Sequence, residues 1–417
     1  MLRYDDGFMR VSDADRAALL PKREAAHAAV EARREDQGWF ELPYDVTGAA
    51  DLRRLADGYA KRFRRLLVVG IGGSDLGART LCRALRKHGG KGMEVVFASA
   101  PDPDVLAPLV KAPKAWWKET VLYVVSKSGG TLETLSTFFL LRQAMVRAVG
   151  TKALPEQIVV TTDPKPENPL LMLAETEGYR IIPHPLDVGG RFSVLSPTGL
   201  FPAACAGVDI AALLEGAKEM ENARRKEGVQ HVSARFAANQ FLAGFAGRKI
   251  HVLMPYAHAL AELGFWYRQL WAESLGKNSQ GPTPVAASGP TDQHSQIQLY
   301  TDGPDDKTVT FVEVEQFGAE FVVPPVKGPR AFSWLAGLDA AQILHAERQG
   351  TAEALYAAGK VNGTLFLDDV SPGSVGALLM FFMQATAYMG AFLGVDTYDQ
   401  PGVEEGKKLA KRLLGGT

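Results

Sequence analysis

Residues 121–135 restrict the possible folds more than any other part of the chain, because they join an apolar run to a glycine-rich turn and then to an apolar helical pattern. Residues 121–125 are short and continuously apolar, as a strand buried inside a parallel sheet must be. A helix that begins after Thr131 would direct its unpaired N–H groups and the positive end of its dipole at the turn. The turn carries three hydroxyl groups and one cation: Ser126, Ser128, Thr131 and Lys127. The stretch therefore predicts a site for an anion, and the simpler interpretation is a well-capped helix with an exposed lysine.

The same succession of apolar strand, glycine turn and helix occurs at residues 65–77. Further strands are expected at residues 94–99, 157–163 and 180–185, and then at 249–254, 296–301, 308–314 and 364–367. Helix-length segments separate them, including an aromatic-rich one at residues 260–275. This alternation predicts an α/β fold with doubly wound, mainly parallel sheets that helices cover on both faces.

The length of 417 residues exceeds one ordinary hydrophobic core, so two domains are expected. We expect an N-terminal helical arm at residues 1–48, a first domain at 49–197, a second at 198–395, and a C-terminal turn and helix at 396–417. Residues 278–290, within the second domain, are polar and rich in Pro and Gly, which predicts a long functional or mobile loop.

The balance of charge excludes some classes of partner. With 46 basic and 47 acidic residues, the chain offers no electrostatic reason to bind nucleic acid or an anionic membrane. The two cysteines, Cys82 and Cys205, lie far apart in apolar surroundings, which predicts buried thiols in a reducing compartment. Acidic residues such as Asp5 and Asp6 stand where a signal peptide needs a basic region and an apolar one, so we expect a cytoplasmic protein.

Residues 374–394 are almost long and apolar enough to span a bilayer. Gln384 and Thr386 interrupt the run, and no basic cluster precedes it. We therefore expect a helix buried on all sides in the core of a soluble domain.

The turn at residues 70–77 partly fits a dinucleotide site. Gly70 and Gly72 match the first two glycines of G-x-G-x-x-G, but Asp75 occupies the third position, and an acid is missing at the end of the next strand. The P-loop pattern fails as well, because Lys127 stands at the wrong end of its turn. Two neighbouring glycine-rich helix starts with hydroxyl groups suit a phosphoryl group and sugar hydroxyls better.

Four further residues are candidates for chemistry. Arg191 follows two glycines, which suits either a fixed cation facing an oxyanion or an arginine on a surface turn. Glu273 lies near Trp266 and Trp271 in the sequence. Apolar surroundings raise the pKa of a carboxylate toward the range useful for a general base, although an exposed helical glutamate is more common. His294, in a polar loop, and Lys407, in a basic C-terminal helix, are by themselves more typical of solvated residues.

Five motifs together resemble the phosphoglucose isomerase family, which is built from two sugar-isomerase (SIS) domains. They are Gly-Ile-Gly-Gly-Ser at residues 70–74, Ser-Lys-Ser-Gly-Gly-Thr at 126–131, Asp-Val-Gly-Gly-Arg-Phe-Ser at 187–193, Glu-Ser-Leu-Gly-Lys at 273–277 and Asp-Gln-Pro-Gly-Val-Glu-Glu-Gly-Lys at 399–407. They occur in the family's order, and the likeness covers nearly everything from Leu66 to the C-terminus. The better-known long members have Ser-Lys-Thr and bulkier residues in the second motif, and they also differ at residues 281–293.

The resemblance implies isomerisation of glucose 6-phosphate and fructose 6-phosphate, in glycolysis and gluconeogenesis. It implies that Glu273 moves a proton between C2 and C1 through a cis-enediol, that Arg191 stabilises the negative charge, and that His294 and Lys407 open the sugar ring. The implied substrate-binding residues are Ser126, Lys127 through its backbone, Ser128 and Thr131 for the phosphate, with Gly72, Ser74, Gly190 and Gln400 for the sugar. The family resemblance also implies a homodimer in which the histidine enters from the neighbouring subunit, with no metal and no organic cofactor.

Three other functions remain open at this point. An isomerase that also accepts mannose 6-phosphate would use the same groups. A sugar-phosphate sensor would bind the ligand without turnover, and Glu273, Arg191 and Lys407 argue against that function. A nicotinamide-dependent oxidoreductase would need the dinucleotide site that Asp75 disfavours.

Overall fold

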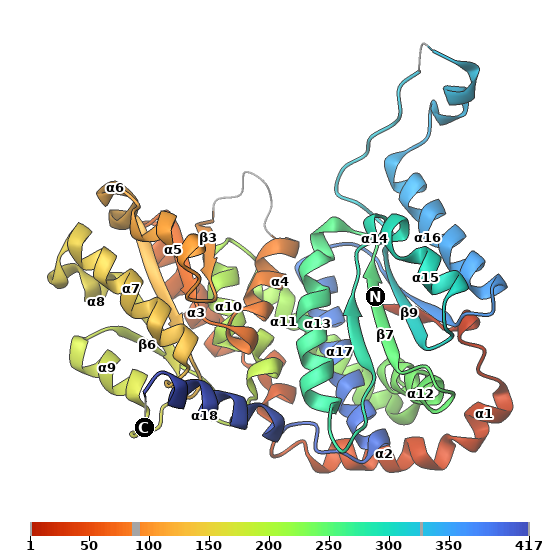
Figure 1. Cartoon of the computed structure of the whole chain (residues 1–417), viewed down its shortest axis with the longest axis horizontal. Helices are drawn as coiled ribbons and strands as arrows, with labels where there is room; N and C mark the ends of the chain where they lie inside the picture. Colours follow the sequence, from red (N-terminus) through yellow and green to blue (C-terminus); the bar gives the residue numbers. More distant parts are fainter. Residues whose placement is uncertain (1, 86–91, 326–327, 416–417) are drawn as a thin grey trace. The chain divides into compact units, whose positions relative to one another are not determined.

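The chain forms two compact units, each built from two separate lengths of sequence. In the computed structural model (Figure 1), the described residues are 2–85, 92–325 and 328–415. Unit 1 contains Met1–Ala32 and Gly216–Thr397, and unit 2 contains Arg33–Glu215 and Tyr398–Thr417. This division differs from the expected boundaries, since most of the expected N-terminal arm belongs to unit 1 and the C-terminal helix belongs to unit 2.

Unit 2 contains a five-stranded parallel sheet with the strand order β3-β2-β4-β5-β6. The strands are β2 (Arg65–Val69), β3 (Glu94–Ala98), β4 (Thr120–Val125), β5 (Ile158–Thr162) and β6 (Arg180–Pro183). Every residue of β4, the central strand, is buried. The structure confirms the strands predicted for the first half of the chain. Their continuous apolar runs fit a parallel sheet that is covered on both faces.

Helices cover both faces of this sheet (Figure 1). Leu67 and Val69 of β2 belong to a core that includes Phe138 and Met145 of α7. Tyr123, on the opposite face of β4, packs edge-on against Phe201 of α10. The helices are α3 (Val46–Ala60), α4 (Leu76–Leu85), α5 (Pro103–Val110), α6 (Lys114–Lys118), α7 (Leu132–Val149), α8 (Leu154–Gln157), α9 (Pro169–Glu177), α10 (Pro197–Cys205) and α18 (Glu404–Leu413), with α11 (Ile210–Glu227) running on into unit 1. Short 3-10 turns occur at Gly38–Phe40, Leu42–Tyr44, Gly72–Ser74, Thr151–Ala153, Gly190–Leu195 and Pro401–Val403.

Unit 1 contains a second five-stranded sheet, in the order β1-β10-β9-β7-β8. The strands are β1 (Arg3–Asp5), β7 (Ile250–Pro255), β8 (Thr283–Ala286), β9 (Lys307–Val314) and β10 (Asn362–Leu367). Four are parallel, and β1 pairs antiparallel with β10, Arg3 lying opposite Phe366. This pairing is why the start of the chain belongs to unit 1.

Helices also cover both faces of the unit 1 sheet. Phe311 of β9 packs in a core with Leu355 of α16. On the other face, the ring of His251 in β7 contacts Phe236 of α12 and Trp271 of α13. The helices are α1 (Asp13–Ala18), α2 (Leu20–Ala32), α12 (Val232–Phe245), α13 (Ala261–Leu275), α14 (Thr291–Ser295), α15 (Ile297–Asp302), α16 (Ala340–Ala357) and α17 (Pro372–Leu393). Short 3-10 turns occur at Gly7–Met9, Gly228–Gln230, His258–Leu260 and Arg330–Leu335.

The apolar helix α17 lies in the core of unit 1. Among the described residues it is the one helix long and apolar enough to cross a membrane, and 89% of its most apolar window is buried inside the protein. The side-chain nitrogen of its polar Gln384 donates to Glu221 Oε2 at 3.0 Å in this core. The prediction of a buried core helix is confirmed, as is the prediction that both cysteines are buried thiols.

The structure of unit 1 differs from the sequence predictions at residues 296–301 and 278–290. Residues 296–301 form most of helix α15 and not a strand; Tyr300 is buried, and its hydroxyl donates to Gln296 Oε1 at 2.6 Å, four residues away, as a helix allows. The predicted loop at residues 278–290 contains β8. As an edge strand paired only with β7, β8 tolerates Pro284, which had suggested a loop.

Between β9 and α16 the chain runs away from the sheet of unit 1 and returns (Figure 1). Main-chain bonds join the two legs of this excursion, from Val323 N to Leu338 O and from Gly337 N to Val323 O, each 2.9 Å long. Its apolar side chains are unusually open to solvent, with Phe321 71% and Trp334 69% exposed.

Candidate functional site

The turn at residues 126–131, the second glycine turn, connects β4 to α7. Thr131 has the extended conformation of a helix N-cap, yet within the described chain its side chain makes no capping bond to α7. Its hydroxyl instead lies 2.9 Å from that of the buried Ser126. The alternative of a helix capped by its own side chain is therefore not what the structure shows, and the turn keeps the features of an anion site.

Close packing holds the second glycine turn in its conformation. Gly129 has a φ of +66°, and a Cβ atom at this position would lie 1.9 Å from Asn168 Oδ1. Asn168 caps α9 with the same oxygen, accepting from Leu170 N at 3.0 Å, and its nitrogen donates to Lys127 O at 3.0 Å. Asn168 thus joins the start of α9 to the backbone of the turn.

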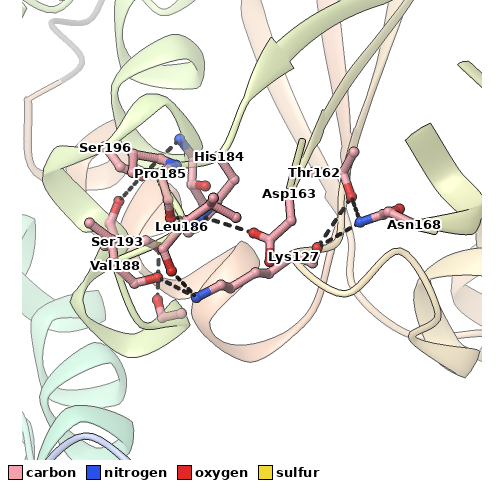
Figure 2. Close-up of polar contacts among 12 residues, drawn as sticks. Lys127, Thr162, Asp163, Asn168, His184, Pro185, Leu186, Val188, Ser193 and Ser196 are labelled. Atoms are coloured by element: carbon pink, nitrogen blue, oxygen red, sulfur yellow. Dashed lines mark hydrogen bonds and ion pairs between the residues drawn. The ribbon is translucent and has the colours of Figure 1, made fainter. Parts of the chain in front are cut away.

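The Lys127 side chain turns away from the hydroxyl groups of its own turn. Figure 2 shows its ammonium reaching the backbone that follows β6, where it donates to Val188 O at 2.8 Å and Leu186 O at 3.3 Å. Burial lowers the pKa of Lys127, and the nearby Asp163 carboxylate opposes that shift. The ammonium therefore points away from the hydroxyl groups of the turn, and binding of an anion by the backbone of Lys127 stays a prediction.

The first glycine turn, residues 70–74, packs against the third, residues 187–191. A Cβ atom on Gly73 would lie 2.4 Å from the carbonyl carbon of Gly190. The Ser193 hydroxyl lies 2.7 Å from Gly190 O and 3.1 Å from Gly73 O, and so links the two turns. Both sugar-binding candidates of the first turn, Gly72 and Ser74, therefore lie next to the turn that carries Arg191.

Asp75 occupies a buried position directly after the first glycine turn. The Ser99 hydroxyl donates to Asp75 Oδ2 at 2.5 Å, and Arg79 Nη1 lies 3.7 Å from the same oxygen. A buried carboxylate at the point where a dinucleotide fold needs its third glycine is unfavourable for a pyrophosphate.

Arg191 is buried and not on a surface turn, with only 3% of its surface exposed. Its guanidinium donates to Gln400 Oε1 at 2.7 Å and to Asp399 O at 2.9 Å. The structure thus brings together two predicted site residues that are far apart in the sequence. A planar cation held by two such bonds is fixed in direction, as stabilisation of an oxyanion requires.

The remaining candidate of unit 2, Lys407, lies on the exposed helix α18. Its ammonium pairs with Glu404 Oε1 at 2.9 Å, one helical turn earlier. In this arrangement the lysine is a solvent-facing cation at the C-terminal end of the unit.

Unit 1 carries the other two candidates. Glu273 lies in the last turn of α13, half-buried, and accepts a bond from Gln269 Nε2 at 3.1 Å. His294 is exposed on the short helix α14, which replaces the solvated loop expected at that position. Among residues 2–85, 92–325 and 328–415, no group of three or more His, Cys, Asp or Glu side chains could hold a metal ion.

No sequence pattern pointed to a group of buried polar residues near the second glycine turn. His184 is buried, and burial lowers its pKa to about 4, so its ring is neutral at pH 7. Its Nδ1–H donates to Pro185 O at 2.8 Å and lies 3.6 Å from Asp163 Oδ1 (Figure 2). Thr162 donates to Ser126 O at 2.6 Å. The one available signal was the Asn168-Pro169 pair, which is typical of a helix start.

Known proteins resemble this chain along almost all of its length. The family model described as phosphoglucose isomerase matches residues 56–301 and 338–416, leaving out β9 and most of the excursion after it. The glucose-6-phosphate isomerase of Carboxydothermus hydrogenoformans is 37% identical over 427 aligned residues, covering 97% of this chain and 91% of that protein.

Two crystal structures share the fold. A hypothetical protein from Thermus thermophilus has a TM-score of 0.92 and 36% identity, with all of both chains covered. A glucose-6-phosphate isomerase from Chlamydia trachomatis has a TM-score of 0.87 at 21% identity, covering 99% of this chain and 88% of that one. The two units thus have the sugar-isomerase type of fold that the sequence implied.

Proposed function

The chain belongs to the phosphoglucose isomerase family, and from this membership we propose that it interconverts D-glucose 6-phosphate and D-fructose 6-phosphate, a step of glycolysis and gluconeogenesis. The observation that carries the proposal is the second glycine turn. It offers the Ser126 and Thr131 hydroxyls at the start of α7, whose first N–H groups Thr131 does not cap. A phosphate monoester is an anion that accepts bonds from hydroxyls and helix N–H groups together.

In this proposal the phosphate and the sugar bind to different turns. The phosphate occupies the second glycine turn, bound by Ser126, Ser128, Thr131 and the backbone of Lys127. The sugar hydroxyls contact Gly72, Ser74, Gly190 and Gln400, a choice supported by the packing of the first turn on the third and by the bond between Arg191 and Gln400. Anchoring the phosphate fixes the sugar carbons relative to the catalytic groups, and such positioning supplies much of the rate.

The proposed chemistry is acid–base catalysis. His294 and Lys407 open the pyranose ring by moving a proton between the ring oxygen and the C1 hydroxyl. Glu273 then removes the proton from C2 and returns it to C1, while a second proton moves between the two oxygens of the cis-enediol. Arg191 stabilises the negative charge that develops on oxygen. A positioned general base of this kind contributes a factor on the order of 10²–10⁴ to the rate.

We further propose that the protein is a cytoplasmic homodimer in which His294 serves the active site of the partner subunit. The exposure of His294 on α14 supports this assignment, because a side chain that acts in another subunit must project from its own.

The function can be tested with a coupled assay. Purified protein is given fructose 6-phosphate and a chelator, and the glucose 6-phosphate that forms is oxidised by an excess of a coupling dehydrogenase. We expect turnover that is unaffected by the chelator. Saturable binding of fructose 6-phosphate without turnover would contradict the enzyme assignment and favour a sensor.

Glu273→Gln tests the assigned base. We expect kcat to fall by about 10²–10⁴ with binding of fructose 6-phosphate changed less than about threefold, because the amide keeps the shape but accepts no proton. Glu353→Gln is a matched control, since Glu353 accepts the same kind of bond, from Gln349 Nε2 at 2.8 Å, on α16. A Glu273→Gln enzyme that kept its kcat would refute the role of Glu273.

A further inference from the structure

Two side chains link the three glycine turns of unit 2. Ser193 bonds to the carbonyls of both Gly73 and Gly190, and so joins the first turn to the third. Lys127 belongs to the second turn, and its ammonium bonds to Leu186 O and Val188 O, the latter within the third turn (Figure 2). The third turn, which ends at Arg191, is therefore held from both sides.

The Lys127 ammonium is well suited to fix this backbone. Both acceptors are main-chain carbonyls, and Val188, whose carbonyl gives the shorter bond, is buried. Bonds from a charged donor are roughly twice as strong as neutral ones and grow stronger in a buried setting. Val188 is three residues from Arg191, so a shift of its carbonyl moves the guanidinium as well.

The backbone of Lys127 is held as firmly as its side chain. Its carbonyl oxygen accepts from Asp163 N at 3.1 Å and from Asn168 Nδ2 at 3.0 Å. The Thr162 hydroxyl bonds to Ser126 O at 2.6 Å. The backbone of Lys127 is thus held by the end of β5 and the start of α9. Through its ammonium, the lysine can hold the third turn at a fixed position relative to these elements.

We propose that the Lys127 side chain is a positioning residue that sets the third glycine turn, and with it Arg191, relative to the second glycine turn, and that its ammonium is not a ligand of the phosphate. The consequence for the reaction rests on the proposed isomerase function. The link between the two turns does not, and each can be tested separately.

The kinetic test compares Lys127→Met with Lys165→Met. Lys165 is an exposed lysine close to Asp163, so the control removes an equal charge from the same region. We expect Lys127→Met to lower kcat by about 10- to 100-fold, as misplacement of a catalytic group by about 1 Å does. Inhibition by inorganic phosphate, which needs only the second turn, should change less than about threefold. A tenfold loss of phosphate affinity would show that the ammonium is a direct ligand and would overturn the proposal.

A double-mutant cycle tests whether Lys127 acts through Arg191. In an Arg191→Ala background, Lys127→Met should cost less than about twofold in kcat, because the group that it positions is gone. Full additivity of the two losses would overturn the proposal. Lys127→Arg, which keeps a donor able to reach both carbonyls, should recover most of kcat, and this variant also serves if Lys127→Met folds poorly.

Amide hydrogen exchange tests the link without any turnover. We expect the amides of residues 186–193 to exchange at least about threefold faster in Lys127→Met than in the natural protein or in Lys165→Met, because the third turn loses its hydrogen bonds to the ammonium. Unchanged exchange in this segment would refute the link even if the enzyme lost activity. Absence of isomerase activity in the natural protein, with faster exchange in Lys127→Met, would refute only the proposed function.

Discussion

At the scale of single residues, two adjacent glycines of the second glycine turn have different structural requirements. Gly129 has a φ of +66° and lies against Asn168, whereas the space around a Cβ atom on Gly130 is open. The two glycines stand side by side in one motif, and the sequence alone does not distinguish their roles. Only the three-dimensional neighbours show that Gly129 is needed for the backbone itself.

Gly129→Ala should therefore lower the free energy of unfolding by more than about 1–2 kcal/mol, the usual cost of a left-handed conformation for a residue with a side chain, because displacement of Asn168 adds to it. Gly130→Ala should leave stability unchanged or raise it by up to about 1 kcal/mol, since it restricts the unfolded chain at a compatible site. Urea denaturation of the two variants measures the difference, and equal stabilities would contradict this account.

Three buried histidines make the stability depend on pH. Burial lowers the pKa of His184 and of His231 to about 4, and that of His251 to about 3. Between these values and the ordinary value near 6.5, the unfolded chain binds protons that the folded chain does not. The free energy of unfolding must therefore decrease as the pH falls from about 6.5 towards 4.

The contribution of His251 can be isolated. Its ring lies 2.8 Å from Thr310 Oγ1 and 2.6 Å from the Tyr267 hydroxyl, so both nitrogens are satisfied in the neutral form. As the pH falls from 6.5 to 5, one such group lowers the free energy of unfolding by up to about 2 kcal/mol. The His251→Gln protein should be less stable than the natural protein at pH 7, but its free energy of unfolding should decrease less on acidification. Urea denaturation at several pH values measures both. An identical pH slope would show that His251 does not contribute.

At the scale of elements, a buried ion pair connects three helices of unit 1. Arg224 of α11 donates to both carboxylate oxygens of Glu221 at 2.8 Å and also pairs with Glu31 of α2. Gln384 of α17 donates to the same Glu221. Neither Arg224 nor Glu221 is exposed, so each depends on the other for its charge to be tolerated.

Glu221→Leu should lower the free energy of unfolding by about 3–5 kcal/mol, because it leaves the Arg224 charge buried without its main partner. Replacing both residues, as Glu221→Leu with Arg224→Met, should cost less than the single change. Glu315→Gln is the control: it breaks an exposed pair of the same unit, with Arg3 at 3.1 Å, and should cost less than about 1 kcal/mol. A double variant as unstable as Glu221→Leu would argue against this explanation.

The elements also show what the sequence could predict. Strand β4 was recognised because all its residues face a covered sheet and are apolar. Strand β1 was missed because it has three residues and depends on β10, more than 300 positions later, for its pairing. Arg191 and Glu273 were proposed as site residues from motifs, whereas the bonds of Ser193 and of the Lys127 ammonium join separate turns and are contained in no local pattern.

At the scale of the whole molecule, the proposed dimer predicts complementation between two inactive variants. Glu273→Gln and His294→Ala each lack one proposed catalytic group. If His294 acts in the partner's site, a mixed dimer contains one site with both natural groups. Denaturing the two variants together and refolding them should then restore about a quarter of the natural activity, the share expected from random pairing into dimers with independent sites.

Each variant refolded alone is the control for this experiment and should stay inactive. Separate refolding followed by mixing should restore activity only as fast as subunits exchange. A mixture that stays inactive, although mixed dimers are shown to form, would mean that the two groups act within one chain.

The discontinuous construction of unit 1 has a consequence for synthesis on the ribosome. The sheet of unit 2 is complete in sequence once β6 has been made, so it can form while translation continues. Strand β1 and helix α2 must wait for β10 and α17, which are translated only near the end of the chain. For most of translation β1 and α2 therefore lack these two partners, and chaperones that bind nascent chains have that time to act on the start of the chain.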